Sequence, residues 1–374
     1  MSVTLALAGD AMLGRGVAEQ LDRTAKPAAF FPAELRDRLA DADFFLLNLQ
    51  CCVSARGSPW RAPGKRFHFR APPQAADLLA GLGVRCVTLA NDHALDFGYD
   101  ALRDTRRHLE RRGIRCVGAG EDVTEARRPA QFEVGGRTLA VVAFADRPAS
   151  FAATGSRPGI AYADLGAGTP AWVRESVAGL RRRTGTVLVS PHWGPDMAGA
   201  PLPYVRTAAG ELLEAGATLV AGHAAHVFQG VEPPVLYDLG DFLDDYAVHP
   251  LLRNDLGLLW LVTLDERGPV RVSALPLRLG HARTRPAAGD DLRWIRHRLT
   301  AACARLGTPV REERGELIVE LRPPAAAPRE PAATHEPAVA HEPAATHEPA
   351  ATHEPVTPSR EPVTEPRAHG GGTS

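Results

Sequence analysis

The chain has no long hydrophobic run and no excess of positive charge. Its longest apolar stretches, near residues 44–53 and 256–264, have the length of strands, whereas a membrane helix needs roughly 20 apolar residues. The first residues lack the basic segment of an export signal. Lys and Arg number 43 against 44 Asp and Glu, so no basic stripe favours nucleic acid. We therefore expect a cytoplasmic protein with no membrane span and no nucleic-acid partner.

Cysteine and lysine are both scarce. The five cysteines form no C-x-x-C pair and are odd in number, which argues against a disulfide framework and for a reducing compartment. Cys86 and Cys116 fall within apolar, strand-like patterns, so we expect buried structural thiols there. Lys26 and Lys65 are the only lysines, so the positive charge is almost entirely arginine.

Short apolar runs alternate with amphipathic segments along the body of the chain. The pattern predicts strands at residues 3–8, 44–47, 84–90, 114–117, 186–190 and 218–221, and helices at 32–40, 73–82, 99–112, 170–183 and 204–215. Two glycines between residues 131–134 and 137–144 favour a hairpin. Repeated strand–helix units are typical of an α/β protein with helices outside its sheets.

The pattern changes after residue 240. Residues 256–264 and 270–277 resemble antiparallel strands, and a helix at 291–306 and a strand at 316–321 follow. We expect a main domain over residues 1–285, with residues 286–322 packing on its core.

The C-terminal segment, residues 323–374, is rich in Pro, Ala, His and Glu. A six-residue repeat places a Glu-Pro pair after each of His335, His341, His347 and His353. A segment with so few large apolar residues cannot offset the entropy of ordering, so we expect a disordered, extended tail. It could serve as a solvated spacer, bind metal weakly through its imidazoles, or contact a protein partner.

Six polar clusters come at or just after strand-like runs. They are Gly9-Asp10, Asn48-Leu49-Gln50, Asn91-Asp92-His93, His192-Trp193-Gly194, Gly222-His223-Ala224-Ala225-His226 and Gly240-Asp241. Parallel sheets collect functional groups at the carboxyl ends of their strands. Carboxylate, amide and imidazole groups gathered there are ligands for divalent metals, which catalyse hydrolysis.

Each cluster taken alone also has a simpler interpretation. Asp10 could cap a turn, Gln50 could cap the backbone, and His192 could be an ordinary hydrogen-bonded histidine. His223 and His226, three residues apart, could converge on a metal or share one helix face. Asp96 could orient His93 or cap the next helix.

Together the clusters resemble one protein family. The matching segments are Ala8 to Arg15, Leu46 to Gln50, Thr88 to Gly98, Pro191 to Gly194, Ala221 to Gly230 and Leu239 to Phe242. They look like the CapA family of capsule or poly-γ-glutamate biosynthesis proteins, within the metallophosphatase superfamily. The resemblance spans about residues 3–280. It implies a calcineurin-like αββα four-layer sandwich with a metal site between its two sheets.

The resemblance also implies roles for individual residues. Asp10, Gln50, Asp92, His192, His223 and His226 would hold one or two divalent ions, with Mn, Fe and Zn all compatible with this mixture of donors. His93 would contact phosphate and act as an acid, and Arg15 would bind an anionic group. The metal ligands and His93 would be oriented by hydrogen bonds with Asn91, Asp96 and Asp241.

Three residues depart from the family pattern. The family segment Asn-Leu-Glu is here Asn48-Leu49-Gln50, and Asn-Asn-His is here Asn91-Asp92-His93. The segment Gly-Asn-Phe is here Gly240-Asp241-Phe242. The first two changes cancel in formal charge, so we expect negative charge to have moved across the site.

These observations predict a CapA-like metal-dependent hydrolase, acting as a phosphoesterase on an anionic small molecule or polymer in capsule or poly-γ-glutamate-type synthesis. The alternative is a non-catalytic binding or assembly module for an anionic polymer, which the change at Gln50 favours. A third interpretation is amide hydrolysis at the same metal centre.

Overall fold

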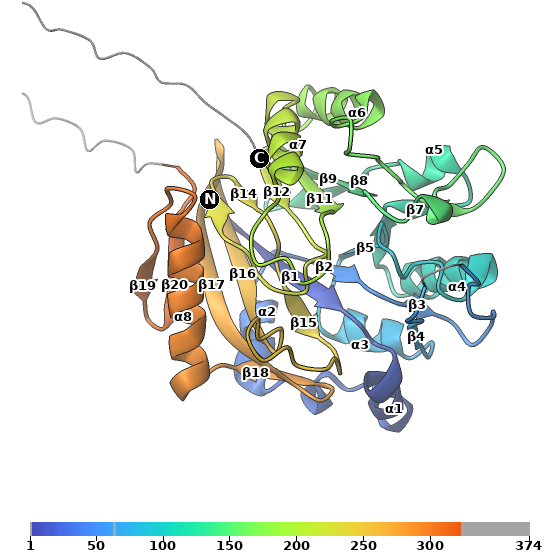
Figure 1. The fold of residues 1–374 in the computed structure, drawn as a ribbon, viewed down its shortest axis with the longest axis horizontal. Helices are drawn as coiled ribbons and strands as arrows, with labels where there is room; N and C mark the ends of the chain where they lie inside the picture. Colours follow the sequence, from blue (N-terminus) through green and yellow to red (C-terminus); the bar gives the residue numbers. More distant parts are fainter. Residues whose placement is uncertain (1, 63–64, 323–374) are drawn as a thin grey trace, which may run out of the picture. The chain divides into compact units, whose positions relative to one another are not determined.

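Two β-sheets, each with helices on its outer side, make up the part of the chain that the structure describes (Figure 1). The computed structural model describes residues 2–62 and 65–322. The expectations for the tail, residues 323–374, lie outside the described residues.

The larger sheet contains ten strands in the described residues. They are β1 (Val3–Ala11), β2 (Phe44–Leu49), β5 (Cys86–Thr88), β6 (Arg115–Val117), β15 (Asp241–Leu243), β16 (Leu256–Asp265), β17 (Gly268–Gly280), β18 (Arg283–Pro286), β19 (Arg311–Glu313) and β20 (Glu316–Glu320). The main order is β19-β20-β17-β16-β1-β2-β5-β6, with β15 paired to β1 and β18 to β17. β1, β2, β5 and β6 are parallel, and β16, β17 and β20 complete the sheet in antiparallel fashion.

The smaller sheet has the order β13-β14-β12-β11-β9-β8. Its strands are β8 (Ala130–Val134), β9 (Arg137–Ala145), β11 (Thr186–His192), β12 (Leu219–Ala221), β13 (Val231–Glu232) and β14 (Val235–Leu236). The predicted hairpin is present, because β8 and β9 pair antiparallel. Two short pairs join β3 (Cys52–Val53) with β4 (Arg70–Ala71), and β7 (Ala119–Gly120) with β10 (Gly159–Ile160).

The two sheets face each other across an apolar core. Phe44 of β2 meets Phe132 of β8 with ring centroids 4.8 Å apart. In β9, Leu139 and Val141 join this core, whereas Val142 belongs to a second apolar cluster on the other face. The alternation follows from the two-residue period of a strand, and it places β9 between two apolar layers.

Helices cover the outer faces of both sheets. They are α1 (Arg15–Arg23), α2 (Ala33–Ala40), α3 (Ala75–Gly81), α4 (Gly98–Arg111), α5 (Val123–Ala126), α6 (Ala171–Arg181), α7 (Pro203–Glu214) and α8 (Gly289–Ala304), with 3₁₀ turns at Pro27–Ala29 and Ala149–Phe151. α6 and α7 share the second apolar cluster with β9 and lie at the top of Figure 1. On the far side, Phe45 contacts Phe242, which stacks on Phe31 just before α2. The predicted αββα sandwich is thus confirmed.

The C-terminal elements are integrated into this sandwich. α8 contacts β16 and β17 of the larger sheet and β13 of the smaller one. β20 pairs with β17, so residues 286–322 extend the larger sheet. In the described residues, no helix combines the length and apolar character needed to cross a membrane.

The five cysteines are all free. Cys86 is buried as expected, but Cys116 is only half-buried. It belongs to β6, the last strand in the order of the larger sheet, where a strand has only one neighbour to cover it.

The short strand β15 was not anticipated from the sequence. It pairs in parallel with β1 and places Asp241 directly opposite Asp10. Three residues are too few to show the alternation that reveals longer strands. This pairing brings residues more than 200 positions apart in the chain to one point.

The buried carboxylate of Asp238 joins the two loops that lead to this point. Its Oδ2 accepts a hydrogen bond from Ala225 N at 2.7 Å, and its Oδ1 accepts one from Gly240 N at 2.8 Å. Ala225 lies between Ala224 and His226, which both have positive φ, a conformation that costs energy for these residues. Asp238 therefore holds a strained loop in place.

Phe44→Ala should destabilise the protein strongly, because it removes the ring that joins the two sheets. Large-to-small changes of this kind cost about 3–5 kcal/mol. Phe67→Ala is the matched control, since Phe67 is 62% exposed and its loss should cost about 1 kcal/mol or less. Chemical denaturation followed by circular dichroism measures both. Equal losses would contradict the assignment of Phe44 to a shared core.

Asp238→Ala should also lower the free energy of unfolding. Each buried N–H left without an acceptor costs about 1–3 kcal/mol. Asp22→Ala, at an exposed position on α1, should change stability by about 0.5 kcal/mol or less. Denaturation curves for the two variants check this. Equal denaturation midpoints would show that the two hydrogen bonds accepted by Asp238 contribute nothing to stability.

Candidate metal centre

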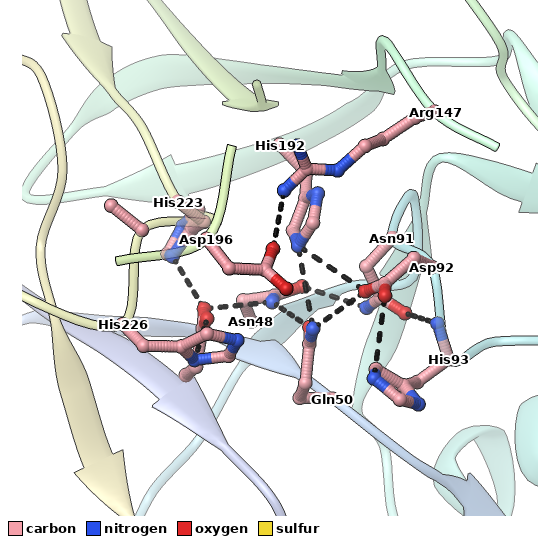
Figure 2. A network of polar contacts seen from close by, with 12 residues as sticks. Asn48, Gln50, Asn91, Asp92, His93, Arg147, His192, Asp196, His223 and His226 are labelled. Carbon is pink, nitrogen blue, oxygen red and sulfur yellow. Dashed lines mark hydrogen bonds and ion pairs between the residues drawn. The ribbon is translucent and has the colours of Figure 1, made fainter. Parts of the chain in front are cut away.

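The polar clusters predicted from the sequence converge on one region between the sheets (Figure 2). The larger sheet supplies Asp10, Gln50, the segment 91–93 and Asp241, and the smaller sheet supplies His192, His223 and His226. An isolated parallel bridge between His192 and His223 aligns the ends of β11 and the loop after β12. Asp10 and His192 lie within their strands rather than after them.

The first group of side chains surrounds Asp10. Its Oδ1 lies 3.2 Å from His223 Nδ1, and its Oδ2 lies 3.3 Å from His226 Nδ1. His226 Nδ1 is also 2.9 Å from Asp241 Oδ1. One ligand atom from each of Asp10, His226 and Asp241 lies within 4.8 Å of the others, so this group could hold a metal ion.

The second group consists of Gln50, Asp92 and His192. Gln50 Nε2 donates to Asp92 Oδ1 at 2.8 Å and lies 3.3 Å from His192 Nε2. His192 Nε2 is 3.7 Å from Asp92 Oδ1. Asn48 lies between the two groups, because its Nδ2 donates to both Asp10 Oδ1 and Gln50 Oε1.

His93 lies beside the second group, and its ring is held by a separate contact with Asp96. Its Nδ1 is 2.6 Å from Asp96 Oδ2, and its Nε2 is 3.4 Å from Asp92 Oδ2. Asp96 makes no cap to α4 but accepts from Phe69 N at 2.6 Å and pairs with Lys65 at 2.7 Å. Of its two predicted alternatives, the structure thus shows the contact with His93.

Arg15 is not among the clustered side chains. It is 46% exposed and pairs with Asp245 at 3.3 Å, and its guanidinium lies 5.8 Å from the Phe69 ring centroid. Phe69 in turn lies 4.3 Å from the His93 ring, so Arg15 reaches only the rim. A second arginine, Arg147, lies near His192 and pairs with Asp196 at 2.6 Å (Figure 2).

Burial and neighbouring charges set the protonation of the site. Burial lowers the pKa of His192 to about 3, against the pull of Asp92 and Asp10. At His226, burial is outweighed by Asp241 and Asp10, which raise its pKa well above the ordinary value. Burial would raise the pKa of Asp92, but His93 and His192 hold it below the usual range.

The buried carboxylates lack sufficient partners in the protein. Burial raises the pKa of Asp241 well above its ordinary value. Asp10 Oδ2 and Asp241 Oδ2 are buried and accept no hydrogen bond from the described residues, and such atoms are costly. A cation would neutralise them, and a mixture of oxygen and imidazole donors suits Mn, Fe or Zn. The donor set therefore fits a divalent metal ion.

Three features of the site were not anticipated from the sequence. Asp241 lies opposite Asp10 in addition to contacting His226, Lys65 anchors Asp96, and Asn48 connects the two groups. The presence of Asp241, where the expected family segment has Asn, was a signal in the sequence for the pairing with Asp10. Lys65 comes from irregular chain, and no pattern marked it.

Comparisons with known proteins identify the family of the chain. The family described as bacterial capsule synthesis protein PGA_cap matches residues 4–246. A relative from Mycobacterium tuberculosis, described as a probable polyglutamine synthesis accessory protein, is 32% identical over 82% of this chain and 93% of its own length. The PGA biosynthesis protein CapA of Bacillus subtilis is 25% identical over 76% of this chain and 74% of its own.

A protein of known crystal structure from Thermus thermophilus aligns with a TM-score of 0.40 and 14% identity, over 76% of this chain and 100% of that chain. That TM-score is too low to support a conclusion about function. The match to the family, over well more than half of the chain, decides the assignment. The chain belongs to the bacterial capsule synthesis protein family PGA_cap.

Proposed function

We propose that this protein is a metal-dependent hydrolase, and that it cleaves phosphate esters in the synthesis of a capsule or poly-γ-glutamate-type polymer. The observation that carries the proposal is the buried group of Asp10, His226 and Asp241, with His93 beside Asp92 in the second group. The descriptions of the relatives as polyglutamine synthesis accessory and PGA biosynthesis proteins support the polymer context.

The chain supplies the ligands from both sheets. Asp10, Asp241 and His226 would hold the ion, with His223 facing the same carboxylate of Asp10. A divalent ion there would act as a Lewis acid toward a phosphoryl oxygen and would activate water. Asp238 keeps the loops carrying these side chains in register.

His93 is the candidate general acid. Asp96 lies at its Nδ1 and is itself held by Lys65 and Phe69 N. This arrangement fixes the ring and leaves Nε2 directed toward the site, beside Asp92. An imidazole held in this way can donate a proton to a leaving oxygen.

Arginines at the rim would bind the anionic part of the substrate. Arg15 is half exposed, and Arg147 pairs with the exposed carboxylate of Asp196. Guanidinium groups match the oxygens of phosphate and carboxylate in a forked geometry. Both an anionic small molecule and an anionic polymer fit this rim.

His93→Ala should lower hydrolysis of an aryl phosphodiester or monoester about 10²–10⁴-fold under added Mn²⁺, because it removes the proton donor. Bound metal, measured by elemental analysis, should stay unchanged. His108→Ala is the matched control, because His108 lies on α4 outside the cluster and its loss should leave turnover intact. Full activity of the His93 variant would remove His93 from the mechanism.

A second candidate is a binding or assembly module for an anionic polymer. The donor amide of Gln50, which faces Asp92 and His192, favours it, because an amide cannot neutralise a cation as a carboxylate does. Incubation of the metal-loaded protein with poly-γ-glutamate separates the candidates. Polymer binding without hydrolysis of either the polymer or the aryl phosphate esters favours the module, and release of new amino termini would indicate amide hydrolysis.

A further inference from the structure

The orientation of three buried amide side chains is determined by the backbone. Asn91 Nδ2 donates to Leu49 O at 2.9 Å, and Asn91 Oδ1 accepts from His93 N at 3.0 Å. An amide oxygen only accepts hydrogen bonds, and an amide N–H only donates them. Exchanging the two ends of the Asn91 amide would therefore break both bonds, so its orientation is fixed.

Asn91 fixes Asn48 in turn. Asn91 Nδ2 also donates to Asn48 Oδ1 at 2.8 Å, and Thr88 Oγ1 donates to the same oxygen at 2.8 Å. The nitrogen of Asn48 must therefore face the other way. It donates to Asp10 Oδ1 at 2.8 Å and to Gln50 Oε1 at 2.6 Å, and both of these contacts require a donor.

Asn48 then fixes Gln50. Because Gln50 Oε1 accepts from Asn48, Gln50 Nε2 faces Asp92 Oδ1 at 2.8 Å and His192 Nε2 at 3.3 Å. An amide N–H is a donor and cannot ligate a metal ion. The ligand atoms of Asp92 and His192 that face each other at this end are thus already engaged by the same amide nitrogen.

The opposite end of the site, around Asp10 and Asp241, presents carboxylate oxygens to a cation. The pairing of β15 with β1 sets Asp241 against Asp10, and both side chains are about 1% exposed. The Oδ2 atoms of both accept no hydrogen bond from described residues. His226 lies between them, so two carboxylates and an imidazole converge where a cation can be coordinated.

We propose that this centre binds a single divalent ion, held by Asp10, His226 and Asp241, and that Gln50 excludes a second ion by donating hydrogen bonds to Asp92 and His192. The inference rests on the metal centre of the proposed function. Metal content is measured without substrate, however, so a failed hydrolysis assay does not decide it.

The test is the Mn²⁺ stoichiometry and affinity of the untagged full chain, measured by equilibrium dialysis with elemental analysis and by electron paramagnetic resonance. The parent should bind one tight Mn²⁺ with the spectrum of an isolated ion. Asp241→Asn should weaken that binding about tenfold or more. Gln50→Glu should bind two ions with a spin-coupled spectrum, because it replaces a donor by a carboxylate beside Asp92.

Asp104→Asn is the matched control, because Asp104 is a buried carboxylate on α4 that pairs with Arg56. Its Mn²⁺ binding should equal that of the parent. Every variant carries the same tail, so binding by the tail histidines cancels between variants, and in the parent only tightly bound Mn²⁺ is counted. The Gln50→Glu and parent measurements stand even where Asp241→Asn fails to fold.

Two tight ions in the parent would overturn the inference while leaving the proposed hydrolase intact. Unchanged Mn²⁺ affinity in folded Asp241→Asn would remove Asp241 as a ligand. A single ion in Gln50→Glu would remove Gln50 as the excluding group. No tight Mn²⁺ in the parent would overturn both this inference and the proposed function.

Discussion

The pairing of β15 with β1 is the constraint on which the candidate site depends. It places two buried carboxylates, Asp10 and Asp241, opposite each other with His226 between them. Like charges this close repel strongly when water is excluded. The fold tolerates them because burial raises the pKa of Asp241 and because His226, whose own pKa is raised by these two carboxyl groups, lies between them. A cation is the natural complement to such an arrangement.

The remaining side chains are arranged by the two-sheet architecture. The larger sheet brings carboxylates and amides, the smaller sheet brings imidazoles, and the apolar core containing Phe44 and Phe132 sets the distance between them. Asp10, His192 and Asp241 lie on strands, which hold side chains more precisely than loops do. This rigidity explains why a chain of amide contacts from Asn91 through Asn48 can dictate what Gln50 presents to the site.

Membership of the PGA_cap family connects this geometry with polymer synthesis. Gln50, Asp92 and Asp241 are the positions at which the sequence departs from the pattern that the resemblance implies, and all three make side-chain contacts within the site. Relative to that expected pattern, Asp92 and Asp241 each carry a carboxylate in place of an amide, and Gln50 carries an amide in place of a carboxylate. The site therefore differs at its two ends, with carboxylate oxygens of Asp10 and Asp241 that accept no hydrogen bond from the described residues at one end and amide hydrogen bonds near Asp92 at the other.

Local patterns in the sequence determined the strand–helix alternation, the hairpin at Gly135-Gly136 and the polar residues at the strand ends, because each is encoded within a few neighbouring residues. Only the tertiary structure decided that Asp241 faces Asp10, that Lys65 anchors Asp96 and that Gln50 presents its nitrogen to Asp92. These contacts join segments distant in the chain. They depend on strand register and on hydrogen-bond direction, which leave no periodic trace in the sequence.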